Sequence, residues 1–169
     1  MTVVGLRATT WLMVSEPAPR WAPALKALIA QQHLADTVLR VESLSSLPRR
    51  SNLVDLHSPT LLMLEVDGTD LPPQLAWIRS VVRSPAVAAV ALLARDVRHF
   101  SANRRQLLTA GLREAGAAAV LSSTGELPTL LGLAARHSAV VANQHREIGS
   151  LRDWVGERLP WQPVPGPLG

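Results

Sequence analysis

The stretch that most constrains the fold reads Thr60-Leu-Leu-Met-Leu-Glu-Val-Asp-Gly68. Four apolar residues in succession suit a strand covered on both faces, as in the parallel sheet of an α/β domain. Glu65 is the first polar residue after this run and falls at the carboxyl end of the predicted strand. Open α/β sheets bind their ligands at that end, so Glu65 is the first candidate for a functional residue.

Apolar runs alternate with segments of helical periodicity along the chain. The predicted strands are Thr9 to Val14, Thr37 to Val41, Thr60 to Glu65, Val87 to Leu93 and Ala117 to Leu121. The predicted helices are Trp21 to Ile29, Ser43 to Leu56, Pro72 to Val82, Asn103 to Ala115 and a last one from Pro128. Alternating strands and helices imply right-handed crossovers and a parallel sheet covered on both faces. Five such units match a flavodoxin-like sheet of order 2-1-3-4-5.

Composition limits the function classes that need to be considered. The chain has 169 residues, of which 47% are apolar, enough for one domain with an aliphatic core. It contains no apolar run near the ~18 residues of a membrane span, and its start lacks the pattern of a secretory signal, so we expect a cytoplasmic protein that does not enter a membrane. The lack of cysteine excludes disulfides and thiolate metal sites. The net charge of +4 is modest and its arginines are scattered, which favours a solvated surface over a nucleic-acid-binding one.

Two stretches together resemble the receiver domain of bacterial response regulators. One is the strand ending in Glu65, where receivers carry the aspartate that accepts a phosphoryl group. The other is Glu114-Ala-Gly-Ala-Ala-Ala-Val-Leu-Ser-Ser-Thr-Gly125, which is similar to the stretch that closes many receivers. The resemblance covers about Thr9 to His137. It implies a CheY-like fold: a five-stranded parallel sheet with helices on both faces.

The resemblance also implies that the phosphoryl-transfer pocket has degenerated. Glu65 replaces the acceptor, and its extra methylene displaces the carboxylate; a misplacement of about 1 Å can cost on the order of 10² in rate. The remaining pocket positions are also altered: Ser15 and Glu16 stand for the acidic pair that helps to hold Mg²⁺, Leu93 for a hydroxyl residue and Ser123 for a lysine. Phosphoryl transfer depends on such groups to offset developing charge. We therefore expect a non-catalytic pseudo-receiver without metal or cofactor, which acts by protein–protein interaction in bacterial signalling or regulation.

Other interpretations remain open on the sequence alone. A shift of register would make Asp67 the phosphoacceptor of a single-domain response regulator, and Glu16, Glu65 and Asp67 could together hold a metal ion. A small nucleic-acid-binding module and a small-ligand domain are further alternatives. No nucleophile elbow, phosphate loop or His-Glu-x-x-His run occurs in the sequence, so we expect the chain not to be an enzyme.

The last predicted helix is longer than a receiver needs. Its pattern continues from Pro128 to about Leu159, roughly 45 Å at 1.5 Å per residue. The sequence therefore divides into a receiver-like domain at 8–140, a helical extension at 141–159 and a proline-rich tail at 160–169, with no further folded domain expected. The apolar residues of the extension, which we expect to carry self-association or partner binding, are Val141, Ile148, Leu151, Trp154, Val155 and Leu159.

Overall fold

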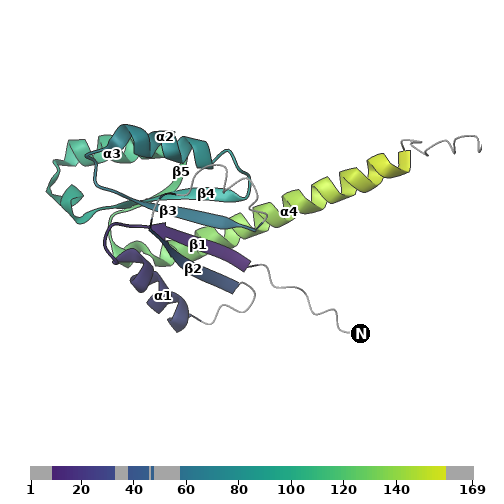
Figure 1. The fold of residues 1–169 in the computed structure, drawn as a ribbon, viewed down its shortest axis with the longest axis horizontal. Helices are drawn as coiled ribbons and strands as arrows, with labels where there is room; N and C mark the ends of the chain where they lie inside the picture. The colour runs from purple at the N-terminus through teal and green to yellow at the C-terminus, as the bar shows by residue number, and fades with distance from the viewer. Residues whose placement is uncertain (1–8, 33–37, 46, 48–57, 159–169) are drawn as a thin grey trace, which may run out of the picture.

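Five parallel strands form one sheet, in the order β2-β1-β3-β4-β5, in the part of the chain that the computed structural model describes: residues 9–32, 38–45, 47 and 58–158 (Figure 1). The strands are β1 (Thr9–Ser15), β2 (Val38–Leu44), β3 (Thr60–Val66), β4 (Val87–Leu93) and β5 (Ala117–Leu121). This is the flavodoxin-like, CheY-like order predicted from the sequence, and that prediction is confirmed.

Helices cover both faces of the sheet. The α-helices are α1 (Trp21–Gln31), α2 (Leu71–Val81), α3 (Ala102–Glu114) and α4 (Pro128–Arg158), and two short 3₁₀ helices are η2 (Arg95–His99) and η3 (Thr124–Glu126). In Figure 1, α2 and α3 lie over one face, and α1 and α4 lie over the other. The connection through α1 runs from β1 to β2, whereas those through α2 and α3 run the opposite way across the sheet, from β3 to β4 and from β4 to β5. Right-handed crossovers therefore place α1 on one face and α2 and α3 on the other.

Alternation along β3 divides the interior into two cores. Leu62, Leu64 and Val66 pack into the core that includes side chains of α2 and α3. Leu61 and Met63 pack into the other core, which includes side chains of α1 and α4. Successive side chains of a strand point to opposite faces, so Glu65 follows Leu61 and Met63 toward the face that α1 and α4 cover.

One predicted helix does not begin where the sequence pattern placed it. The prediction was a helix from Ser43 to Leu56, but Ser43 and Leu44 belong to β2 and pair with Val14 and Ser15 of β1. Ladder hydrogen bonds at the edge of the sheet outweigh a helical pattern that Pro48 already interrupts. Residues 46 and 48–56, the rest of this predicted helix apart from Ser45 and Leu47, lie outside the described residues.

Helix α4 is continuous over 31 residues and projects well past the sheet (Figure 1). Val141 is only 2% exposed and lines a hollow together with Thr9 and Pro59, so its side chain packs against the domain. Ile148, Leu151, Trp154 and Val155 lie on the projecting part, where the structure describes the backbone alone; Leu159 lies outside the described residues. Among the described residues, none of the helices combines the length and the apolar character needed to cross a membrane.

Gly116, between α3 and β5, provides a test of the fold. Its φ is +106°, and a Cβ added there would lie 2.9 Å from Cγ2 of Val82. Gly116→Ala should therefore cost about 1–3 kcal/mol through backbone strain and overlap. The thermal midpoint should fall by about 2–4 °C for each kcal/mol.

Gly132 within α4 is the matched control, because among the described residues nothing lies within 4 Å of a Cβ built there. Gly132→Ala should raise stability by about 0.5–1 kcal/mol, the preference of a helix interior for alanine. Calorimetry on both variants checks the pair. Equal stability of Gly116→Ala and the wild-type chain would contradict this conformation.

Candidate functional site

A hollow of about 380 Å³ opens at the carboxyl edge of the sheet. It is lined by Ala18, Pro19, Arg20, Glu65, Ala94, Arg95 and Asp96. These residues come from the β1–α1 loop, the end of β3 and the segment after β4, which meet at this edge because the three strands are parallel neighbours. The location is the one at which open α/β sheets bind ligands.

Glu65 forms part of the wall of the hollow. It pairs in register with Leu92 of β4, and its side chain is half-buried. Among the described residues, no hydrogen-bond partner reaches its buried Oε2 atom. Burial raises the pKa of the Glu65 carboxyl above its ordinary value, because the charged form loses hydration, and the positive charge of Arg20 opposes that rise.

Arg20 is the cation that faces this carboxylate. Its guanidinium Nη1 donates a hydrogen bond to the carbonyl oxygen of Leu93 at 3.3 Å, at the end of β4. The guanidinium also lies 4.4 Å from the centroid of the Trp21 ring, a distance suited to a cation–π interaction. Burial lowers the pKa of Arg20, and the Glu65 charge opposes that fall. The result is an arginine held between α1 and β4, with its charge beside Glu65.

Trp21 completes the surroundings of Glu65. The residue is 1% exposed, and its indole Nε1 is buried without a hydrogen-bond partner among the described residues. The indole N–H lies close enough to Glu65 to lower the pKa of that carboxyl, although the contact falls short of hydrogen-bond geometry. Glu65 therefore lies near both an arginine and an indole, which are supplied by the N-cap and the first residue of α1.

The Glu16 side chain caps the N-terminus of α1. Its carboxylate accepts hydrogen bonds from the backbone N–H groups of Arg20, Trp21 and Ala22, at 2.9, 2.7 and 3.0 Å. These are N–H groups that a helix leaves without intrahelical partners, and no side chain of the N-cap residue itself satisfies them. The position that resembles a receiver's metal-binding acid thus acts as a helix cap.

Asp67 lies in a turn and does not line the hollow. Its Oδ1 accepts a hydrogen bond from the backbone N–H of Thr69 at 2.9 Å, and this bond lowers the pKa of the Asp67 carboxyl. Gly68, with φ of +77°, completes the turn. The described residues contain no group of three or more His, Cys, Asp or Glu side chains arranged to hold a metal ion. The structure therefore does not bring Glu16, Glu65 and Asp67 together as a metal site.

The other pocket positions lie apart from the hollow. The Ser15 side chain is half-buried at the end of β1, and the Leu93 side chain is buried in the core beneath α2 and α3. The residue after Leu93, Ala94, lines the hollow.

Ser123 caps η3. Its hydroxyl and that of Ser122 both donate to Glu126 Oε1, and the backbone N–H groups of both serines donate to the same atom. The hydrogen bond from the Ser122 side chain is the main reason why the pKa of Glu126 is lowered. Ser123 and Glu126 therefore form a capping box at the start of η3, and the hydroxyls of Ser122 and Ser123 are both engaged with Glu126.

Sequence reasoning missed Arg20 as a member of the site. The available signal was its place at the start of a helix, four residues after Glu16, in a loop that follows a buried strand. A single arginine before an apolar helix is usually part of the solvated surface. Its role depends on which carboxylate the fold brings beside it.

Comparison with known proteins gives the fold. No protein-family model and no curated protein matches the sequence. The chain is similar to the solved structure of a CheY-like protein, TadZ, from Pseudomonas aeruginosa, with a TM-score of 0.51 and 17% identity over 77% of this chain and 93% of that one. It is also similar to a putative pilus assembly protein, CpaE, from Burkholderia thailandensis, with a TM-score of 0.49 and 24% identity over 76% of this chain and 98% of that one. The first similarity shows a CheY-like, receiver-like fold.

The raised pKa of Glu65 predicts a dependence of stability on pH. A carboxyl whose folded-state pKa is raised stabilises the fold fully below its unfolded pKa, near 4.5, and loses that contribution as the pH rises through the folded value. Glu65→Gln removes the charge at every pH. The variant should therefore melt about 1–2 °C above the wild type at neutral pH, the shift that ~0.5 kcal/mol gives in a chain of this size.

This advantage should shrink as the pH falls toward 4.5. Glu42→Gln, at an exposed position on β2, is the control for loss of a carboxylate as such. Melting curves of the three proteins across this pH range provide the measurement. A Glu65→Gln protein that is less stable than the wild type at neutral pH, with the deficit vanishing in acid, would reverse the assigned direction.

Proposed function

We propose that this chain is a pseudo-receiver, which works through protein–protein contacts and not through phosphoryl transfer. The observation that carries the proposal is Arg20, whose charge lies beside Glu65 in the hollow where a receiver would bind its metal ion. An arginine in this place supplies a permanent positive charge. The chain thus has its own cation where a receiver depends on Mg²⁺.

Electrostatics argues against metal binding in this hollow. Mg²⁺ prefers a nearly octahedral set of oxygen ligands, whereas Glu16 already accepts three backbone hydrogen bonds. Arg95 and Arg98 lie near enough to Arg20 to lower its pKa, so three guanidinium groups share this region. A divalent cation would be repelled by all three, and Glu65 alone offers too few oxygens to offset that repulsion.

The other side chains that a receiver uses in phosphoryl transfer are also missing from the hollow. The residue that lines the hollow after β4 is Ala94, which has no hydroxyl, and the hydroxyl of Ser123 is engaged with Glu126. The carboxylate of Glu65 extends one methylene further than that of an aspartate. Among the described residues, the lining of the hollow includes no lysine and no hydroxyl to contact a transferred phosphoryl group.

The receiver-like fold supports a role in bacterial signalling or regulation in the cytoplasm. Receiver-like folds present several helix faces on a rigid sheet, and such faces suit partner binding without any reaction. Glu65 and Arg20 would then hold the pocket in one state, where a receiver alternates between two.

Incubation with acetyl phosphate and Mg²⁺, followed by intact-mass measurement, tests the proposal. We expect no added phosphoryl group, while a catalytically complete receiver in the same buffer gains one. Addition of a phosphoryl group to this chain would contradict the proposal. Loss of that addition in Asp67→Asn would then assign the acceptor to the turn after β3.

Thermal melting with Mg²⁺ and beryllofluoride gives a second readout on the unmodified chain. A ligand at a hundredfold excess over its Kd stabilises the native state by about 2.7 kcal/mol. We expect no shift of the melting temperature, and a clear upward shift would indicate a working pocket.

We further propose that the projecting part of α4 carries association, of two copies or with a partner. Ile148, Leu151 and Val155 recur at intervals of three and four residues, so they share one side of the helix. Anchoring of the first turns in the domain, where Leu130 and Ala134 are buried, holds the extension in helical form before any partner binds.

The association test uses two substitutions that each add one negative charge. Leu151→Glu places the charge on the apolar side, and Ser150→Glu places it well away from that side, 100° further round the helix. By light scattering over a wide range of concentration, we expect Leu151→Glu to lower self-association and Ser150→Glu to leave it unchanged. A wild-type chain that stays monomeric throughout would contradict self-association.

A further inference from the structure

A second opening, which we call the Phe100 groove, lies apart from the hollow over Glu65. It measures about 180 Å³ and is lined by Gly68, Leu71, Phe100, Arg104, Leu107 and Leu108. The two openings share no lining residue. The groove runs between the β3–α2 turn and the start of α3. It therefore belongs to the face of the molecule that α2 and α3 cover.

The floor of the groove is apolar and preformed. Phe100 packs directly against the backbone of Gly68, where a Cβ would lie 2.8 Å from its Cε2 atom. Leu108 is buried beneath the groove, whereas Leu107 on its rim is 66% exposed. An exposed leucine next to a half-buried phenylalanine forms one continuous apolar surface, with room for a single bulky side chain. Such anchors are typical of peptide-binding sites.

The rim of the groove on the α3 side is basic. The guanidinium of Arg104 lies 3.8 Å from the centroid of the Phe100 ring, so a cation covers part of the apolar floor. The neighbouring arginines Arg98 and Arg105 are also exposed, whereas Arg95 and Asp96 line the hollow beside Glu65.

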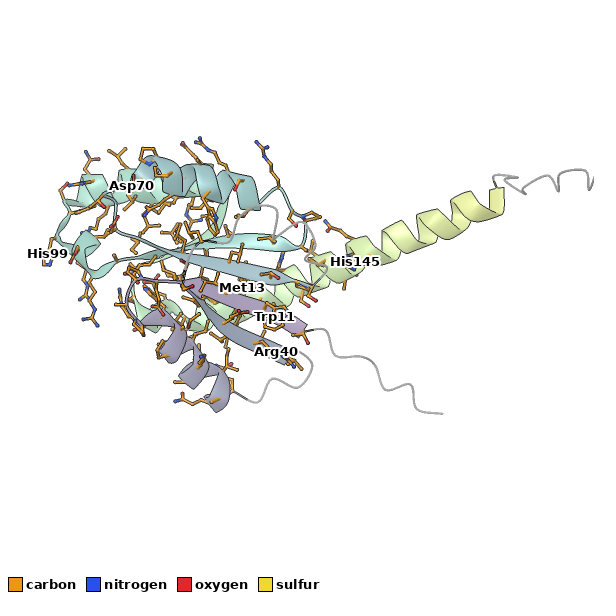
Figure 2. The ribbon with its side chains drawn as sticks, in the orientation of Figure 1. Trp11, Met13, Arg40, Asp70, His99 and His145 are labelled. Carbon is orange, nitrogen blue, oxygen red and sulfur yellow. The ribbon has the colours of Figure 1, made fainter. Side chains whose placement is uncertain are left out.

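The opposite rim carries two acids. Asp67 is tied to the backbone of Thr69, and Asp70 is exposed before α2. Figure 2 shows Asp70 and His99 at the same end of the molecule, the end where the strands finish. The positive charge of the groove therefore lies on its α3 side, where Arg104 lines it and Arg105 is exposed beside Arg104.

We propose that the Phe100 groove docks an acidic segment of a partner protein through one bulky apolar side chain. The apolar residue would contact Phe100 and Leu107, and flanking carboxylates would pair with Arg104 and Arg105. Arginine forms bidentate hydrogen bonds with carboxylates and stacks on aromatic rings, and Arg104 is already positioned for both. The inference rests on the proposed protein-interaction function and names the chemistry of the partner.

The same features disfavour a nucleic acid as the occupant. A phosphate backbone would use the arginines but would leave Leu107 exposed, and its affinity would not depend on that side chain. A partner that combines carboxylates with an apolar anchor would contact both the arginines and Leu107.

Selection of short random peptides displayed on phage against the full chain tests this proposal. We expect the enriched peptides to carry aspartate and glutamate around one Leu, Phe or Trp. Leu107→Gln and Arg104→Glu should each weaken binding of the enriched peptides by about tenfold or more, the loss typical of a central contact residue. Both side chains are exposed, so both variants should fold.

Two matched controls separate the groove from general surface effects. Val140→Gln replaces another exposed apolar side chain, 52% exposed on α4, and Arg113→Glu reverses a charge at the other end of α3. Neither should change peptide affinity. Enrichment of peptides without acidic residues, or binding that ignores Leu107 and Arg104, would overturn the proposal, as would an absence of any enrichment.

Binding of a DNA duplex that Arg104→Glu weakens and Leu107→Gln does not, in place of peptide binding, would also overturn the proposal, in favour of nucleic acid. None of these results bears on phosphoryl transfer. The intact-mass experiment tests the pseudo-receiver separately, so the failure of one proposal is distinguishable from the failure of the other.

Discussion

The hydrogen bonds from the first turn of α1 to the Glu16 carboxylate determine the rest of the site. They fix where the helix begins, and a negative charge at a helix N-terminus is favourable in itself. Because α1 begins there, Arg20 and Trp21 lie at the carboxyl edge of the sheet, next to Glu65. Arg20 then reaches across to the carbonyl of Leu93 and ties the helix to β4. One loop carboxylate thus places a cation and an indole beside the second carboxylate, which β3 positions.

In the function that we propose, this arrangement replaces the exchangeable Mg²⁺ ion of a receiver with a fixed cation. A metal ion can leave and a phosphoryl group can be hydrolysed, whereas the charge of an arginine is permanent. The carboxyl edge of the sheet would therefore stay in one state, and any regulation by this chain would come from what binds elsewhere on it. Two surfaces outside the hollow beside Glu65 are candidates for such binding: the Phe100 groove and the projecting part of α4.

The sequence predicted the features that repeat, and missed those that depend on neighbours in space. The run from Thr60 identified β3 and placed Glu65 at its end, and continuous apolar stretches gave β4 and β5 their observed bounds. The sequence analysis assigned the hydroxyl position of a receiver to Leu93, whereas the next residue, Ala94, lines the hollow. A shift of one residue along a strand moves a side chain to the opposite face. Val141 is buried and lines one hollow with Thr9 and Pro59, an arrangement that spacing along a helix cannot reveal.

The central claim is that Arg20 supplies the charge that faces Glu65, and titration of the Glu65 side-chain carboxyl by ¹³C NMR tests it most directly. In the wild-type chain, the account predicts a pKa above the ordinary 4.5, because burial outweighs the attraction of Arg20. In Arg20→Gln the pKa should rise further, since burial then acts without its main opponent, and Arg95→Gln should change it less. The same titration midpoint in the wild type and in Arg20→Gln would contradict the account.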